Sequence, residues 1–277
     1  MRKSAYILPI LLALFVSATA ESQTKININQ LQSQAANTVL GNATGSTAAV
    51  TALPMPSCAP TAGGLNWTAA SGFACKTNLH TRQVFLTGTS ATYTTPAGVR
   101  QIVVKIKGGG GGAGGSTTGG TNGGNSIFNG INATGGTAGG SGTASGGTGG
   151  TGGAGTASIR IAGAPGQAGY PFIYSATNSI GVGGAGGGAG GGVGQNGNGT
   201  SAAANSGGGG GAGGKSASIF GNYSYGGGGG EGEYAEIIIN SPAATYAYTV
   251  GAKGTGGTGD YVNGDGAAGF VVVDEYY

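Results

Sequence analysis

The sequence is short of charge, of proline and of the side chains that build ordinary cores. Of 277 residues, 11 are Lys or Arg, 8 are Asp or Glu, and 47 are Leu, Ile, Val or Phe, a smaller apolar share than globular chains use. The net charge of +3 is too low for disorder driven by charge repulsion. Eight prolines are too few for collagen, and the glycines fall in runs rather than in strict triplets. None of these three classes of protein therefore fits.

Histidine and cysteine are also scarce, since only His80, Cys58 and Cys75 are present. No His, Cys and carboxylate residues share metal-ligand spacing, so neither a metal nor another cofactor is expected. An even number of cysteines in an exported chain favours a Cys58–Cys75 disulfide, whose closed loop would contribute about 3 kcal/mol. The alternative is a Cys75 nucleophile served by His80, but no third orienting group is visible.

The first 20 residues resemble an export signal. Arg2 and Lys3 precede an apolar run, Ala5 to Val16, and the small residues Ala18-Thr19-Ala20 form a cleavage site. The apolar run is too short for a membrane span. Cleavage removes two basic residues, which leaves the mature chain near neutral, and binding of nucleic acid needs clustered Lys and Arg. The sequence therefore predicts a secreted or cell-surface protein with no nucleic-acid partner.

Glycine is what the chain has in abundance, and 53 of its 68 glycines lie between Gly108 and Gly232. Such a stretch forms neither α-helix nor ordinary sheet, because glycine loses the most backbone entropy and has no side chain to bury. One ordered option is a bundle of polyglycine helices of the polyproline II type, packed closely because no Cβ intervenes. The alternative that composition leaves open is a flexible linker.

β-type segments flank the glycine-rich middle on both sides. In Val99 to Lys107, Ile102, Val104 and Ile106 share one face, which predicts a half-buried strand. We expect an all-β fold with little or no α-helix after the signal peptide. Its predicted parts are the signal peptide (1–20), an Ala/Thr/Asn-rich stalk or small β module with the disulfide (21–82), and a glycine-rich domain (83–277). In that domain, sandwich-like flanks (83–107 and 233–277) enclose the glycine-rich core (108–232).

Three segments interrupt the glycine, Ser126 to Ala133, Ser158 to Ile180 and Lys215 to Tyr225. A linker has no reason to gather bulky groups, so the segments are either hydrophobic plugs or exposed loops. Because Tyr dominates over Leu and turn formers punctuate the longest segment, we expect binding loops on a rigid scaffold. The predicted receptor-binding residues are Phe128, Tyr170, Phe172, Tyr174, Phe220, Tyr223 and Tyr225.

Two motifs that suggest enzymes lack the right surroundings. Gly209 to Ser216 matches the phosphate-binding loop of nucleoside triphosphatases letter for letter, but no apolar strand precedes it and no helix follows. No nucleotide is therefore expected. Glu231, Glu233, Glu236, Asp260 and Asp265 could in principle serve glycoside hydrolysis or bind calcium. We expect solvated turns at these acids instead, and no enzymatic activity.

The two ends of the glycine-rich part resemble a known family. Ser90 to Val99, with the strand that leads into Gly108 to Gly112, is similar to the start of the glycine-rich domain of bacteriophage tail-fibre and tail-tip proteins. Gly232 to Glu236 and Ser241 to Gly251 resemble its end. The resemblance implies a β scaffold around polyglycine helices that binds host receptors through loops. Tail proteins ordinarily lack an export signal, so Met1 to Ala20 leaves an exported cellular protein of prophage origin as an open alternative.

The leading functional hypothesis is an exported, adhesin-like protein that binds a cell-surface receptor or glycan through its aromatic loops, with a homotrimer formed through the N-terminal stalk as a further option. A virion tail is the alternative location. The alternative functions are a structural surface protein without a specific receptor and, as a minor one, an ice-binding protein, which would need a flat, regular Thr/Ala face.

Overall fold

The computed structural model describes residues 38–41, 46–47, 51–56, 64–68, 72–76, 80–142, 145–175, 178–194, 197–218 and 224–277, and it divides the chain into two compact units, Met1–Lys76 and Thr77–Tyr277. The boundary lies before residue 82, where the composition changes, because Arg82 already belongs to the second unit. Its guanidinium donates to both carboxylate oxygens of Asp274, at 2.5 and 3.1 Å. Among the described residues no helix occurs, and hence none that could cross a membrane.

The described part of the first unit consists of two antiparallel hairpins. Strand β1 pairs with β2 and β3 with β4; their bounds are Thr38–Gly41, Thr51–Pro54, Gly64–Thr68 and Gly72–Lys76. The rings of Trp67 and Phe73 meet edge to face across the second hairpin, with centroids 4.9 Å apart. Cys75 lies in β4, whereas Cys58 and the signal peptide lie outside the described residues. The Cys58–Cys75 pairing and the export signal stay predictions.

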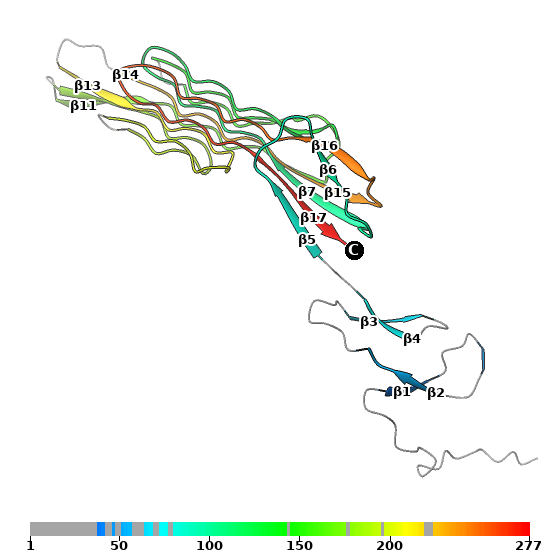
Figure 1. Ribbon diagram of the computed structural model, residues 1–277. Coiled ribbons are helices and arrows are strands. Elements are labelled where there is room, and N and C mark those ends of the chain that lie inside the picture. Colours follow the sequence, from blue (N-terminus) through cyan, green and yellow to red (C-terminus); the bar gives the residue numbers. More distant parts are fainter. Residues whose placement is uncertain are drawn as a thin grey trace, which may run out of the picture. The chain divides into compact units, whose positions relative to one another are not determined.

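The second unit contains three antiparallel sheets, which confirms the all-β prediction (Figure 1). Their strand orders are β10-β15-β7-β17-β5, β6-β16-β8-β9 and β11-β12-β13-β14. The bounds are His80–Phe85 (β5), Ala91–Thr94 (β6), Gln101–Lys107 (β7), Ser126–Phe128 (β8), Ile131–Ala133 (β9), Ile159–Ile161 (β10), Tyr170–Ser175 (β11), Asn178–Val182 (β12), Gly214–Ser218 (β13), Ser224–Tyr225 (β14), Tyr234–Asn240 (β15), Thr245–Thr249 (β16) and Phe270–Tyr276 (β17).

The hydrophobic core lies between the five-stranded sheet and the sheet that contains β6 and β16. Ile102, Val104 and Ile106 of β7 are completely buried, as the alternation in the sequence predicts. Aromatic rings from the two sheets meet between them, for example Phe85 of β5 and Tyr93 of β6 with centroids 6.2 Å apart. Strands from both flanks of the glycine-rich middle therefore build one core, and hairpin β8–β9 adds a contribution from the middle itself.

Beyond this core the glycine-rich chain runs back and forth in segments that lie side by side (Figure 1). Three inner segments, 108–115, 207–213 and 226–233, are hydrogen-bonded to one another through their backbones. Nine outer segments surround them in a closed ring, and we call the inner and outer segments together the bundle. In ring order the outer segments are 118–124, 134–140, 145–153, 163–169, 183–189, 190–194, 197–203, 262–269 and 250–258. The described residues of the middle therefore differ from a flexible linker.

The direction of the backbone hydrogen bonds repeats every third residue. In segment 108–115, the N–H groups of residues 108, 111 and 114 donate to segment 226–233, and those of 109, 112 and 115 donate to segment 118–124. Residues 110 and 113 donate to segment 262–269. Three residues per turn is the repeat that the polyglycine prediction requires. The left-handed geometry of the individual segments stays a prediction.

The longest glycine runs in the sequence correspond to the inner segments. Most positions of a segment with neighbours on every side have no room for a side chain: a Cβ on Gly110 would lie 1.8 Å from the carbonyl oxygen of Gly208. The runs Gly108–Gly112, Gly207–Gly211 and Gly226–Gly230 meet this demand at five consecutive positions. Outer segments have one open side, and there the third residue is often Thr, Ser, Asn or Ala, as in Gly146-Gly147-Thr148-Gly149-Gly150-Thr151.

The polar residues of the outer segments take up backbone donors that face away from the bundle. The hydroxyl oxygens of Thr121 and Thr118 accept from the N–H groups of Thr255 and Thr258, at 2.7 and 2.8 Å. The side-chain oxygen of Asn122 does the same for Ala138 at 2.8 Å. These hydrogen bonds lie at the exposed surface, and each of them links two neighbouring outer segments.

Substituting Gly229 by Ala should unfold the second unit or lower its free energy of unfolding by about 3 kcal/mol or more, as severe overpacking does. The new Cβ would lie 2.0 Å from the carbonyl oxygen of Gly111. Gly119→Ala is the matched control, because its nearest neighbour would be 3.4 Å away. Urea denaturation measures both variants; equal losses would contradict the inner and outer assignment.

Substituting Thr121 by Val should speed hydrogen exchange at the Thr255 amide and cost about 0.5–1.5 kcal/mol of stability. Valine keeps the shape of threonine but cannot accept the Thr255 N–H. Thr121→Ser keeps the hydroxyl and should preserve the protection of that amide. If Thr121→Val and Thr121→Ser gave the same exchange rate, the hydroxyl of residue 121 would not be what protects the Thr255 amide.

Candidate functional site

Parts of two of the three aromatic segments meet at the end of the bundle that lies away from the hydrophobic core (Figure 1). They form the sheet β11-β12-β13-β14, which we call the tip sheet. Strand β11 pairs with β12 in register Tyr170↔Val182, and β13 pairs with β14 in register Gly214↔Tyr225. The sequence analysis expected loops here, but these short segments pair as strands. It is their position at one end of the bundle that gathers them.

The predicted binding residues differ in their exposure and in how much of them the structure describes. Tyr170 opens β11 with 52% of its surface exposed, and Tyr225 of β14 is partly buried beside the backbone of Gly169. Phe172 and Tyr174 lie in β11, where the structure describes the backbone only. Phe220 and Tyr223 lie outside the described residues.

Phe128 is a correction to the predicted site. Its side chain has no exposed surface, and it packs against Tyr93 and Tyr246 in the hydrophobic core. The hairpin β8–β9 pairs through β8 with β16, at the opposite end of the bundle from the tip sheet. A sequence pattern of aromatic residues between glycines cannot distinguish a plug from a loop, and this segment is a plug.

The turn after segment 250–258 adds residues that the sequence analysis did not assign to a binding site. The Lys215 amino group lies 3.6 Å from an Asp260 carboxylate oxygen, and both side chains are about half exposed. Tyr261 lies against Gly213: a Cβ added to Gly213 would lie 2.7 Å from the Cβ of Tyr261. Burial and the nearby Asp260 carboxylate raise the pKa of Tyr261. Asp260-Tyr261-Val262 interrupts the glycine as the other segments do, but beyond residue 232.

The segment that matches a phosphate-binding loop has a different role. Gly209 to Gly213 belongs to an inner segment of the bundle, and its N–H groups at Gly209, Gly210 and Gly211 donate to carbonyl oxygens of neighbouring segments. Lys215, the lysine of the motif, faces Asp260. A cradle for phosphate needs free N–H groups at the start of a helix, and neither is present in these residues.

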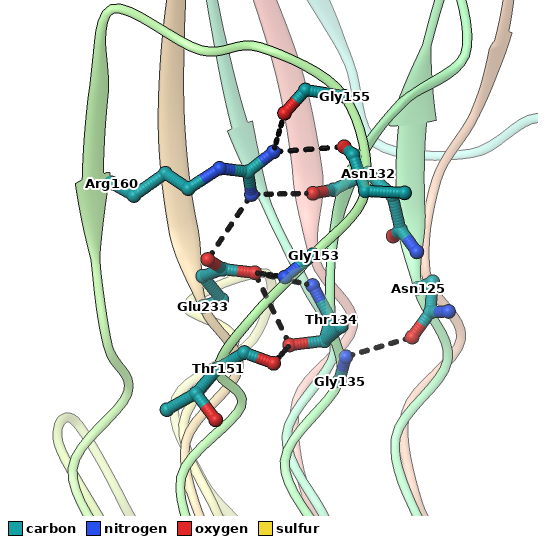
Figure 2. Close-up of polar contacts among 10 residues, drawn as sticks. Asn125, Asn132, Thr134, Gly135, Thr151, Gly153, Gly155, Arg160 and Glu233 are labelled. Atoms are coloured by element: carbon teal, nitrogen blue, oxygen red, sulfur yellow. Dashed lines mark hydrogen bonds and ion pairs between the residues drawn. The ribbon is translucent and has the colours of Figure 1, made fainter.

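Glu233, at the end of segment 226–233, is buried and hydrogen-bonded to the bundle itself (Figure 2). One Glu233 carboxylate oxygen accepts from Arg160 at 3.1 Å, and the other accepts from the N–H groups of Thr134 and Gly153. Arg160 also donates to the carbonyl oxygens of Asn132, Ala154 and Gly155. Because Glu233 is 2% exposed, the prediction of a solvated turn is wrong here.

The carboxylate of Glu231, like that of Glu233, accepts from one cationic side chain and from the backbone of an outer segment. Its carboxylate accepts from the Lys107 amino group at 2.6 Å and from the Ala164 N–H at 3.0 Å. Asp265 pairs with Lys253 at 2.6 Å and accepts from the Gly256 N–H. In the part of the chain that the structure describes, no three His, Cys, Asp or Glu residues are grouped to hold a metal ion.

The free energy of unfolding should decrease as the pH is lowered and Glu233 becomes protonated. Burial alone would raise the pKa of this carboxyl, but hydrogen bonds from Thr134, Arg160 and Gly153 outweigh it, and the pKa lies below the usual 4.5. A folded-state pKa below the unfolded value gives stability that is present above about pH 4.5 and lost as pH falls. Glu233→Gln should cost about 3 kcal/mol at pH 7, because Arg160 loses its partner.

The matched control is Glu236→Gln, since Glu236 is only half-buried and accepts from the Tyr234 hydroxyl. Urea denaturation from pH 7 to pH 3 should show the gap between wild type and Glu233→Gln closing in acid. A gap that stayed constant with pH would mean that the Glu233 charge does not stabilise the junction.

Comparison with known proteins found no matching family model, curated protein or solved structure. The functional argument therefore depends on the geometry of the chain itself.

Proposed function

We propose that this protein is a non-enzymatic, exported, adhesin-like protein that presents the tip sheet to a cell-surface receptor or glycan. The observation that carries the proposal is the meeting of two aromatic segments, far apart in sequence, at one end of the bundle. Clustered, partly exposed tyrosines on a rigid scaffold are typical of binding surfaces. On this proposal the glycine-rich segments are polyglycine helices that act as a spacer.

The positions of the two ends of the second unit also support this proposal. The chain enters this unit at β5, which pairs along β17 in register His80↔Tyr276 beside the C-terminus. The tip sheet lies at the opposite end of the bundle (Figure 1). A unit that is attached at one end can present the other end to a partner. This arrangement also suits the resemblance to phage tail-tip proteins, which we retain as part of the proposal.

A structural surface protein without a specific receptor is the second candidate. The observation in its favour is the extent of the hydrogen-bonded bundle, which needs no ligand to explain its construction. The two candidates differ at the tip, because only the adhesin depends on the identity of the tip side chains.

Replacing Tyr170, Phe172 and Tyr174 together by Ala should abolish binding of the full-length protein to bacterial cells, measured by fluorescent labelling and flow cytometry. Loss of two or more interface aromatics costs at least about 30-fold in affinity. Tyr276→Ala is the control, because this tyrosine is 40% exposed but lies at the other end of the unit. Undiminished labelling by the triple variant, with circular dichroism unchanged, would sink the adhesin and leave the structural candidate.

A further inference from the structure

Charge at the tip sheet is almost absent and cancels where it occurs. The strands β11 to β14 contain one charged residue, Lys215. Its amino group faces the Asp260 carboxylate at 3.6 Å, so the pair has no net charge. Recognition of phosphate, sulfate or carboxylate groups relies on unpaired Arg or Lys. The described tip residues therefore do not suit an anionic polymer or lipid headgroup.

One edge of the tip sheet, strand β11, is also poorly suited to a protein strand. Strand β11 is an edge strand, because it pairs with β12 alone. Pro171 is its second residue and lacks the N–H that an added strand would need as a donor. Partners that extend a sheet gain affinity through main-chain hydrogen bonds. The exposed proline removes one such bond beside the exposed ring of Tyr170.

Tyrosines from three parts of the chain lie at the base of this sheet. Tyr170 begins β11, Tyr225 lies beside the preceding Gly169, and Tyr261 lies against Gly213 just before β13. A tyrosine offers a flat apolar ring with a hydroxyl at its rim, and it loses little conformational entropy on binding. A sugar ring is complementary to it, since it has an apolar C–H face and hydroxyl groups at the edge.

We infer that the base of the tip sheet, where Tyr170, Tyr225 and Tyr261 lie, binds an uncharged saccharide. The inference rests on the proposed function and adds the chemical class of its ligand. Binding through ring stacking and neutral hydrogen bonds is insensitive to ionic strength, whereas binding through charge weakens as salt screens it.

The test measures binding of the full-length protein to immobilised neutral polysaccharides (glucan, mannan and galactan) and acidic ones (alginate and polygalacturonate). We expect binding to at least one neutral polymer, changed less than about twofold between about 50 and about 500 mM NaCl. Tyr170→Ala should weaken it at least about tenfold, whereas Tyr276→Ala should not.

Several outcomes would overturn the saccharide inference. They are binding to no neutral polymer, preference for the acidic polymers, and a steep loss of binding in salt. On bacterial cells, periodate oxidation of surface sugars should abolish labelling and protease treatment should not; the reverse result identifies a protein receptor. In that case the saccharide inference fails while the proposed adhesin stands. If the triple tip variant labels cells normally, both fail.

Discussion

The fold depends on the close approach of backbones that carry no side chains. The direction of the N–H groups repeats every third residue, so successive N–H groups point to different neighbours and an inner segment is hydrogen-bonded on every side. A Cβ on most inner glycines would meet a carbonyl oxygen at about 2 Å, as at Gly229. The hydrogen bonds that offset the entropy cost of ordering glycine therefore exist only because the residues are glycine. The backbone hydrogen bonds of the inner segments are made within the bundle, and the hydrophobic core lies at one end of it.

This constraint explains how so few charges stabilise so much chain. Glu231 and Glu233 end an inner segment, and each reaches one cation and at least one N–H group of an outer segment. Each carboxylate therefore fixes the register of segments that are far apart in sequence; Glu233 and Arg160 are 73 residues apart. Glycine segments have no side chains that specify register, and a slip by one residue would unpair these buried charges.

The β flanks and the role of glycine could be predicted because their signals are local. Alternation in β7 and the punctuation around β6 identify strands, and runs of five glycines mark segments with no open side. The burial of Phe128 and of Glu233 could not be predicted, because each depends on a distant partner, Tyr246 or Arg160. The tip strands are short and rich in Ser, so their pairing has no clear pattern in the sequence. Tyr261 was missed because it lies outside the main glycine-rich stretch.

The threonine and asparagine side chains of the outer segments have a consequence for neighbouring molecules. Layers of glycine-rich backbone could in principle add further chains without limit, as an open sheet edge does. At Thr255, Thr258 and Ala138 the outward N–H group is already occupied by a side chain of the same molecule. At these positions an approaching glycine-rich chain finds no free donor. The same side chains that hold the outer segments together thus leave fewer free backbone donors to an approaching chain.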